Sequence, residues 1–185
     1  MRDRMRAGQL YKADDPVLRA DYEQGQALLH RYNATQPDED ALRKELLLQL
    51  LGSCADAVTV QPPFRCDYGR YIHIGEGSFV NYDAIFLDVM PIRVGAGCQF
   101  APRVQLLTAT HPVEPEARRA GWESGSPVTI GDNVWLGAGV IVCPGVTVGD
   151  NSVIGAGSVV VKDIPADVVA VGSPARVVRS VHGPS

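Results

Sequence analysis

The sequence predicts a mainly β protein, a parallel β-helix that follows a short helical segment and releases one long loop. Three observations lead to this fold class. Aliphatic residues return every six positions over the second half of the chain, apolar residues recur at helical spacing in the first fifty, and the six-residue repeat is interrupted once. A length of 185 residues suffices for one such domain with a buried core.

Residues 1–57 are expected to form the helical segment. Within 14–33, Val17, Leu18, Tyr22 and Leu29 recur at helical spacing. After the turn NATQP, a second helix begins near Pro37 among acidic residues and ends before a glycine. The segment therefore holds two helices, which are too few and too short to enclose a core by themselves.

Residues 58–181 are expected to form the β-helix and a C-terminal tail. From Ile130 the chain reads IGDNVW, LGAGVI, VCPGVT, VGDNSV, IGAGSV, and the same phase is visible from Val94, with a shifted copy from Ile74. A strict period of six is typical of stacked short strands whose aliphatic residues point inward in one column. The GDN and GAG corners suit bends with positive φ. A β-sandwich fits less well, because its strands usually recur every eight to twelve residues.

The repeat is absent from about residue 111 to residue 127, and these residues are expected to loop out of the coil. Excursions from a regular solenoid cost packing and often line a functional site. His111 lies at the edge of this loop, and Pro112 restricts its backbone to extended conformations. A lone histidine is more often structural than catalytic, but this position makes His111 a candidate catalytic residue.

Composition limits the possible partners. The net charge of −4 argues against nucleic acid, no run is apolar enough to cross a membrane, and the basic N-terminus lacks the apolar stretch of a secretory signal. We therefore expect a cytoplasmic protein. Its cysteines contain no C-x-x-C pair and are expected to be buried free thiols rather than disulfides or zinc ligands. They are Cys54, Cys66, Cys98 and Cys143.

Several segments together closely resemble the bacterial sugar O-acetyltransferases, with maltose acetyltransferase the nearest type and the galactoside and nodulation acetyltransferases as relatives. These segments are the hexapeptide repeats, RCDYG at 65–69, TATHP at 108–112 and VVAVGSPARVVR at 168–179. The resemblance implies a left-handed β-helix with triangular coils, against the general right-handed preference of parallel crossovers. It also implies a homotrimer and acetyl-CoA as acyl donor.

The resemblance implies that His111 is the general base. A neutral imidazole can take the proton of a sugar hydroxyl and pass it to the departing CoA thiolate. The oxyanion needs hydrogen-bond donors, either backbone N–H groups or the Asn81 amide, which the resemblance places near the site. Cysteine catalysis is the alternative, but Cys98 and Cys143 lie inside the repeat without an activating partner nearby. We therefore expect direct transfer in a ternary complex.

The acceptor site needs carboxylates and amides that bind hydroxyl groups. Asp67 and Asn81 match the acceptor residues of the family. Galactoside acetyltransferases carry two aspartates where this chain has Asp88 and a valine, so Asp88 is expected to be the remaining contact. An N-terminal acid also contributes in the family; here it is Asp15, with Asp14 as the alternative. For each of these acids, an ordinary solvent-exposed surface position is an equally simple interpretation.

The donor site is expected near the C-terminus, where basic residues can bind the phosphates of CoA. Lys162, Arg176 and Arg179 are the candidates, although the two arginines would also suit a solubilising tail. Ala138, Ala156 and Val161 match family positions that touch the cofactor. Trp135 either walls the thiol end or packs at a subunit interface.

The predicted function is therefore acetyl-CoA-dependent transfer of an acetyl group to a sugar hydroxyl. One alternative is an acetyltransferase for another acceptor, such as an antibiotic, serine or the amine of a nucleotide sugar. A second is a β-helix that serves assembly without catalysis. His73 and His111 resemble part of the zinc site of hexapeptide-repeat carbonic anhydrases, but the close histidine pair of those enzymes is missing, so no metal is expected.

Overall fold

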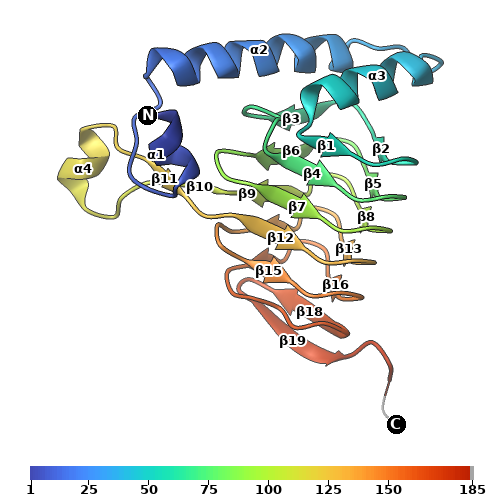
Figure 1. Cartoon of the computed structure of the whole chain (residues 1–185). Helices are drawn as coiled ribbons and strands as arrows, with labels where there is room; N and C mark the ends of the chain where they lie inside the picture. The colour runs from blue at the N-terminus through green and yellow to red at the C-terminus, as the bar shows by residue number, and fades with distance from the viewer. Residues whose placement is uncertain (184–185) are drawn as a thin grey trace.

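The computed structural model describes residues 1–183 and forms a parallel β-solenoid of about six turns. Figure 1 shows the coils stacked in sequence order, with helices over the N-terminal end and the C-terminus at the opposite end. This arrangement confirms the predicted mainly β class, the parallel β-helix, the helical start and the extruded loop.

Five coils each contribute one short strand to each of three sheets, and a C-terminal antiparallel hairpin extends the second sheet. The first sheet contains β1 (Ser53–Cys54), β4 (Ile72–Ile74), β7 (Ile92–Val94), β12 (Val128–Ile130) and β15 (Thr147–Val148). The second contains β2 (Thr59–Val60), β5 (Phe79–Val80), β8 (Gln99–Phe100), β13 (Trp135–Leu136), β16 (Val153–Ile154), β18 (Val168–Gly172) and β19 (Ala175–Ser180). The third contains β3 (Phe64–Cys66), β6 (Ala84–Leu87), β9 (Gln105–Leu107), β14 (Ile141–Val142) and β17 (Val159–Val160).

The core is the interior of this prism. In the first sheet Val94 pairs with Ile74 on one side and Ile130 on the other, and Ile130 pairs in turn with Val148. All four side chains point inward and are buried. The expected aliphatic column is therefore present, and it places apolar residues in register from coil to coil.

The corners between the first and second sheets explain the recurring GDN sequence. Asn133 and Asn151 adopt positive φ angles of 54° and 58°, and Gly97 takes 66° at the equivalent position one coil earlier. The preceding aspartates tie the coils together, since the carboxylate of Asp150 accepts the backbone N–H of Asp132 at 2.8 Å. Asn tolerates this left-handed conformation better than most residues, which accounts for its place in the repeat.

Three helices precede the first coil: α1 (Arg2–Arg6), α2 (Pro16–Asn33) and α3 (Asp40–Leu50). Helices α2 and α3 cover this coil, whereas α1 lies at the side of the solenoid, next to the extruded loop (Figure 1). The Asn33 side chain bonds both the N–H of Phe64, at 2.9 Å, and its carbonyl, at 2.8 Å. The two predicted helices are present, whereas α1 is an addition. Strand pairing begins at β1, inside the segment 1–57.

No helix among residues 1–183 has the length and apolar content needed to span a bilayer.

The extruded loop leaves the coil between β9 and β12. It contains β10 (Ala109–Thr110), α4 (Pro115–Arg119) and β11 (Ser124–Gly125), and β10 pairs antiparallel with β11. Glu123 forms a two-way backbone bridge with Tyr11, with N···O distances of 2.9 and 3.0 Å. Because of this bridge, the loop and the segment after α1 lie side by side, as Figure 1 shows.

Candidate active site

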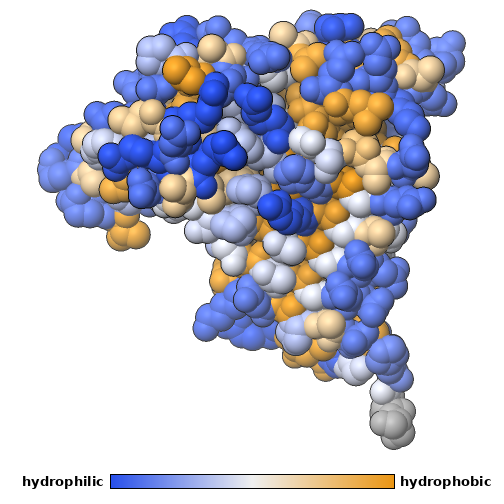
Figure 2. Space-filling view, in the orientation of Figure 1, coloured by the Kyte–Doolittle hydropathy of each residue, from blue (hydrophilic) through white to orange (hydrophobic). Residues whose placement is uncertain are grey.

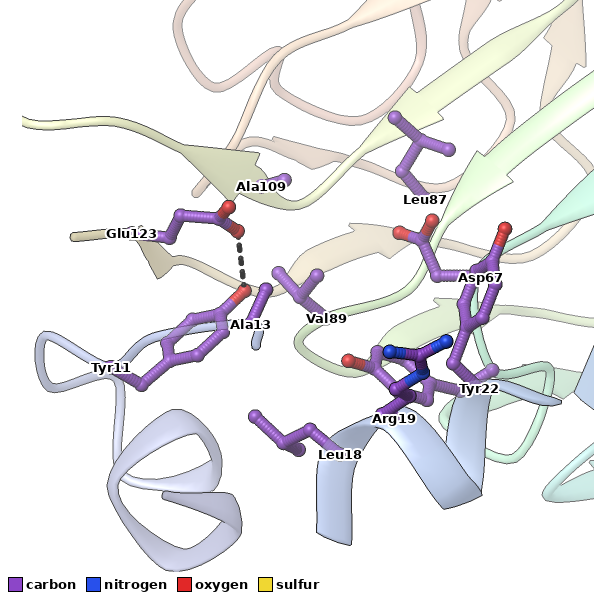
Figure 3. Close-up of a pocket in the computed structure, with 11 residues that line it drawn as sticks. Tyr11, Ala13, Leu18, Arg19, Tyr22, Asp67, Leu87, Val89, Ala109 and Glu123 are labelled. Carbon is purple, nitrogen blue, oxygen red and sulfur yellow. Dashed lines mark hydrogen bonds between the residues drawn. The ribbon is translucent and has the colours of Figure 1, made fainter. Parts of the chain in front are cut away.

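A cavity of about 370 Å³ lies where the extruded loop, the start of α2 and the corner between the third and first sheets meet. Its volume falls in the range of small-molecule sites. Figure 3 shows the side chains that surround it. The lining residues are Tyr11, Ala13, Leu18, Arg19, Tyr22, Asp67, Tyr68, Leu87, Val89, Ala109 and Glu123.

Asp67, which the resemblance suggests as an acceptor residue, lines this cavity. Its backbone is fixed on both sides: its N–H donates to the Asp88 carboxylate at 3.0 Å, and its carbonyl accepts from Gln26 at 3.0 Å. Its carboxylate makes no hydrogen bond within residues 1–183. Burial, followed by the negative charge of Glu123, raises the pKa of Asp67 to about 6. A rigidly held carboxylate with unused acceptor capacity is suited to bind a ligand hydroxyl.

Glu123 is a second carboxylate in the cavity, and sequence reasoning did not identify it. Its Oε2 accepts a hydrogen bond from the Tyr11 hydroxyl at 3.1 Å. Figure 3 shows the carboxylates of Asp67 and Glu123 entering from opposite sides. Tyr22 and Tyr68 add aromatic surface and pack edge to face, with ring centroids 6.4 Å apart. Acidic acceptors among aromatic rings are the combination expected for a polyhydroxylated ligand.

Asp88 differs from the expected acceptor contact. It is fully buried, and its oxygens accept the backbone N–H groups of Asp67, Tyr68 and Tyr71 at 3.0, 2.9 and 3.2 Å. Burial raises its pKa to about 7, although backbone hydrogen bonds, those of Tyr68 and Tyr71 among them, oppose the rise. The carboxylate faces the backbone of the corner and does not line the cavity. Its role in this structure is to hold Asp67 in place.

The N-terminal acids also lie outside the cavity. Asp15 caps α2: its Oδ1 accepts the backbone N–H groups of Val17 and Leu18 at 3.1 and 3.3 Å. Asp14 is exposed. Ala13 and Arg19, on either side of these acids in sequence, line the cavity instead. Neither acid lines the cavity of the single chain, and Asp15 acts as the N-cap of α2.

His111 and Asn81 lie at different corners of one chain. His111 follows β10 at the corner between the third and first sheets, and its side chain is exposed beyond Ala109, which lines the cavity. Asn81 follows β5, at the corner between the second and third sheets, and its Oδ1 accepts the N–H of Tyr82 at 2.8 Å. The third sheet separates the two corners, so a single chain does not bring these side chains together.

Four of the expected donor residues lie at these two corners, and the other three lie on strands of the second sheet. Ala138 and Ala156 are exposed and stacked at the Asn81 corner, where the Ala138 carbonyl accepts the N–H of Gly157 at 2.8 Å. Val161 and Lys162 follow β17 at the His111 corner, and both are exposed. Arg176 and Arg179 are exposed on β19. Trp135 projects from the second sheet with 55% of its surface exposed.

Two family models match the chain. One is the maltose acetyltransferase hexapeptide capping motif, over residues 4–55, and the other is the bacterial transferase hexapeptide, six repeats, over residues 127–162. The first coincides with the helices and the start of the solenoid, and the second with the coils after the extruded loop. Fold and matches together define a transferase of the hexapeptide-repeat class.

Whole-chain comparisons narrow this class. A maltose O-acetyltransferase structure from Clostridium difficile 630 is 50% identical, with a TM-score of 0.96, and the match covers 97% of this chain and 96% of that one. A galactoside acetyltransferase solved with coenzyme A is 40% identical, with a TM-score of 0.95, over 98% and 90% of the two chains. Nodulation protein L of Rhizobium meliloti (strain 1021) is 46% identical over 95% of this chain and 96% of its own length. The chain belongs to the galactoside and maltose O-acetyltransferase family and is an acetyltransferase.

Proposed function

We propose that this enzyme transfers the acetyl group of acetyl-CoA to a hydroxyl group of a sugar-like acceptor bound in the cavity of Asp67. The observation that carries the proposal is the unpaired Asp67 carboxylate, held among tyrosines next to the strand that leads to His111. The coenzyme A bound to the related galactoside acetyltransferase supports the choice of donor.

The reaction needs one proton acceptor and one group that stabilises negative charge. The His111 imidazole removes the proton as the acceptor oxygen attacks the thioester carbonyl carbon. The Asn81 amide donates a hydrogen bond to the resulting oxyanion. When the tetrahedral intermediate collapses, the carbon–sulfur bond breaks and the imidazolium returns the proton to the CoA thiolate. No covalent enzyme intermediate is required.

This mechanism requires a homotrimer, because one chain keeps His111 and Asn81 apart. The outward side chains of the third sheet are mostly apolar and include Ile85, Ile141 and Val159. If three chains turn this sheet toward a common axis, the His111 corner of each chain meets the Asn81 corner of the next. The active sites then lie in the grooves between neighbouring chains.

The same arrangement unites the donor residues. Val161 and Lys162 of one chain approach Ala138 and Ala156 of its neighbour, whose small side chains leave room for the pantetheine arm. Trp135, three residues before Ala138, walls this groove. Lys162, Arg176 and Arg179 bind the phosphate groups through charge-assisted hydrogen bonds.

The direct test is a thiol-release assay with acetyl-CoA and a panel of sugars and alcohols, corrected for hydrolysis. We expect turnover with at least one sugar, and Asp67→Asn is expected to raise the KM for that sugar about tenfold or more, because charged acceptors form the stronger hydrogen bonds. Asp38→Asn, an exposed acid far from the cavity, is the matched control. Sugar turnover with an unchanged KM in Asp67→Asn would contradict the assignment of this cavity.

A further inference from the structure

A second cavity, of about 450 Å³, lies beside α1 and has a different chemistry. Four of its eight lining residues are arginines, in a chain whose net charge is −4. Figure 2 shows strongly hydrophilic side chains gathered over α1 and next to the first coils. The lining residues are Arg2, Arg6, Arg70, Tyr71, His73, Val89, Pro91 and Arg93.

The positive charges of this cavity are mostly not neutralised by the protein. Asp21 binds two of the guanidinium groups: Arg2 donates to both of its oxygens at 2.7 Å, and Arg70 to one of them at 3.0 Å. The carboxylate itself is buried, so these hydrogen bonds fix both arginines. Arg6 and Arg93 form no ion pair within residues 1–183. Two of the four guanidinium groups therefore share one carboxylate, and the other two have no ionic partner within residues 1–183.

The arginine charges also affect the pKa values of two neighbouring side chains. Burial raises the pKa of Tyr71, while the charges of Arg70, Arg6 and Arg2 oppose the rise. Burial and then Arg93 lower the pKa of His73 on the adjacent strand. Helix α1, the corner after β3 and strand β7 thus direct guanidinium groups toward one hollow.

This cavity is separate from both sites of the acetyl transfer. The proposed donor residues lie at the far end of the solenoid, after β13 and beyond, whereas the arginine cavity lies beside β4 and β7. The acceptor cavity contains two carboxylates and shares only Val89 with it. The convergence of arginines is therefore not explained by the binding of acetyl-CoA or of a sugar.

We propose that the arginine cavity is a binding site for a small anion that carries two or more phosphate-type charges. Guanidinium groups match phosphate oxygens through paired hydrogen bonds, and an anion removes the mutual repulsion of the arginines. Asp21 fixes the positions of Arg2 and Arg70. Arg6 on α1 and Arg93 on β7 bind the anion from the other sides of the cavity.

Titration calorimetry with inorganic pyrophosphate, at an ionic strength held constant with chloride, tests this proposal. We expect saturable binding to the wild-type protein. In the double variant Arg6→Gln/Arg93→Gln the dissociation constant should rise about tenfold or more, since two charge-assisted contacts are lost. Both arginines are exposed and make no hydrogen bond through their side chains within residues 1–183, so the variant is expected to fold. Arg31→Gln, an exposed arginine on α2, is the matched control.

A second double variant, Arg176→Gln/Arg179→Gln, separates this site from the donor site. It is expected to weaken coenzyme A binding and to leave pyrophosphate binding unchanged. The proposal is overturned if wild-type protein gives no saturable signal, if Arg6→Gln/Arg93→Gln binds as the wild type does, or if the donor variant loses pyrophosphate. None of these measurements depends on acetyl transfer. The anion-site proposal is therefore tested independently of the proposed function.

Discussion

Asp67 combines burial with a neighbouring negative charge, and both raise its pKa, to about 6. As pH falls through this value, the carboxylate gains a proton and loses its charge. We therefore predict that the KM for the acceptor rises between pH 7 and pH 5. Glu123→Gln removes one of the two causes, so the rise should begin at a lower pH. Steady-state kinetics over this range check the prediction, and identical profiles in both proteins would contradict it.

The raised pKa of Asp67 also makes the stability of the folded protein depend on pH. Because the pKa is higher in the folded protein than the ordinary value of 3.8, protonated Asp67 is favoured by folding. The stabilisation that comes from protonated Asp67 is therefore fully present below pH 3.8, and it is lost as the pH rises through 6. We predict that Asp67→Asn raises the melting temperature at pH 8 relative to wild type while it weakens acceptor binding. The difference in melting temperature should shrink toward pH 4.

His111 is the residue whose loss should affect the chemical step alone. We predict that His111→Ala lowers kcat by about two to four orders of magnitude, the usual contribution of a positioned general base. Coenzyme A affinity and oligomeric state should persist, because the exposed ring makes no side-chain hydrogen bond within residues 1–183. His30→Ala, on the exposed side of α2, is the control. A His111→Ala enzyme with full kcat would exclude this residue as the base.

The family resemblance singled out Asp67 as a candidate acceptor residue, but it did not identify the residues around it. Glu123 joins the site through a bridge to Tyr11, a contact between residues more than a hundred positions apart that no local pattern reveals. Asp15 precedes Pro16, a pairing typical of a helix N-cap followed by its first residue, and this signal favours the capping role seen here. The burial of Asp88 was not visible in the sequence, since a polar residue at a corner can face either way.

At the scale of the element, the coil corners limit which residues the repeat accepts. A Cβ atom added to Gly131 would lie 2.1 Å from Oδ1 of Asp150 and 2.8 Å from its backbone nitrogen. We predict that Gly131→Ala destabilises the fold by about 1–3 kcal/mol through this overlap. Gly97→Asn should be tolerated, because Asn133 occupies the equivalent position with positive φ. Thermal unfolding of the two variants measures the difference, and equal loss in both would contradict the steric explanation.

The elements differ in how much of them the sequence predicts. The solenoid was predictable because each coil repeats the same inward aliphatic position and the same corner, so every repeat supports the assignment of the others. Helix α1 has only five residues, and Met5 is its one buried side chain, which leaves no periodicity to detect. Its position depends on the neighbouring loop and on the ion pair between Arg2 and Asp21, both of which are tertiary contacts.

At the scale of the whole molecule, the three faces of the prism have different outward chemistry. The first sheet presents Ser53, His73, Arg93, Thr129 and Thr147, which are polar and suit solvent. The third sheet presents mostly aliphatic side chains, which suit contact with other protein surfaces. That sheet lies between the corners of His111 and Asn81. The proposed trimer would therefore bury the apolar face and complete the proposed active site through the same contact.

This association predicts that a single charge on the third sheet removes both assembly and activity. Ile141 points outward between Gln105 and Val159. In the proposed trimer, Ile141→Asp would bring three carboxylates close to the common axis, where desolvation and repulsion oppose them. Sedimentation should show a smaller species, and acetyl transfer should fall with it, because each proposed site combines residues of two chains. Thr129→Asp, outward on the first sheet, adds the same charge and should leave a fully active trimer. An active monomer of Ile141→Asp would mean that one chain can complete the site, and the shared groove would then have no role in catalysis.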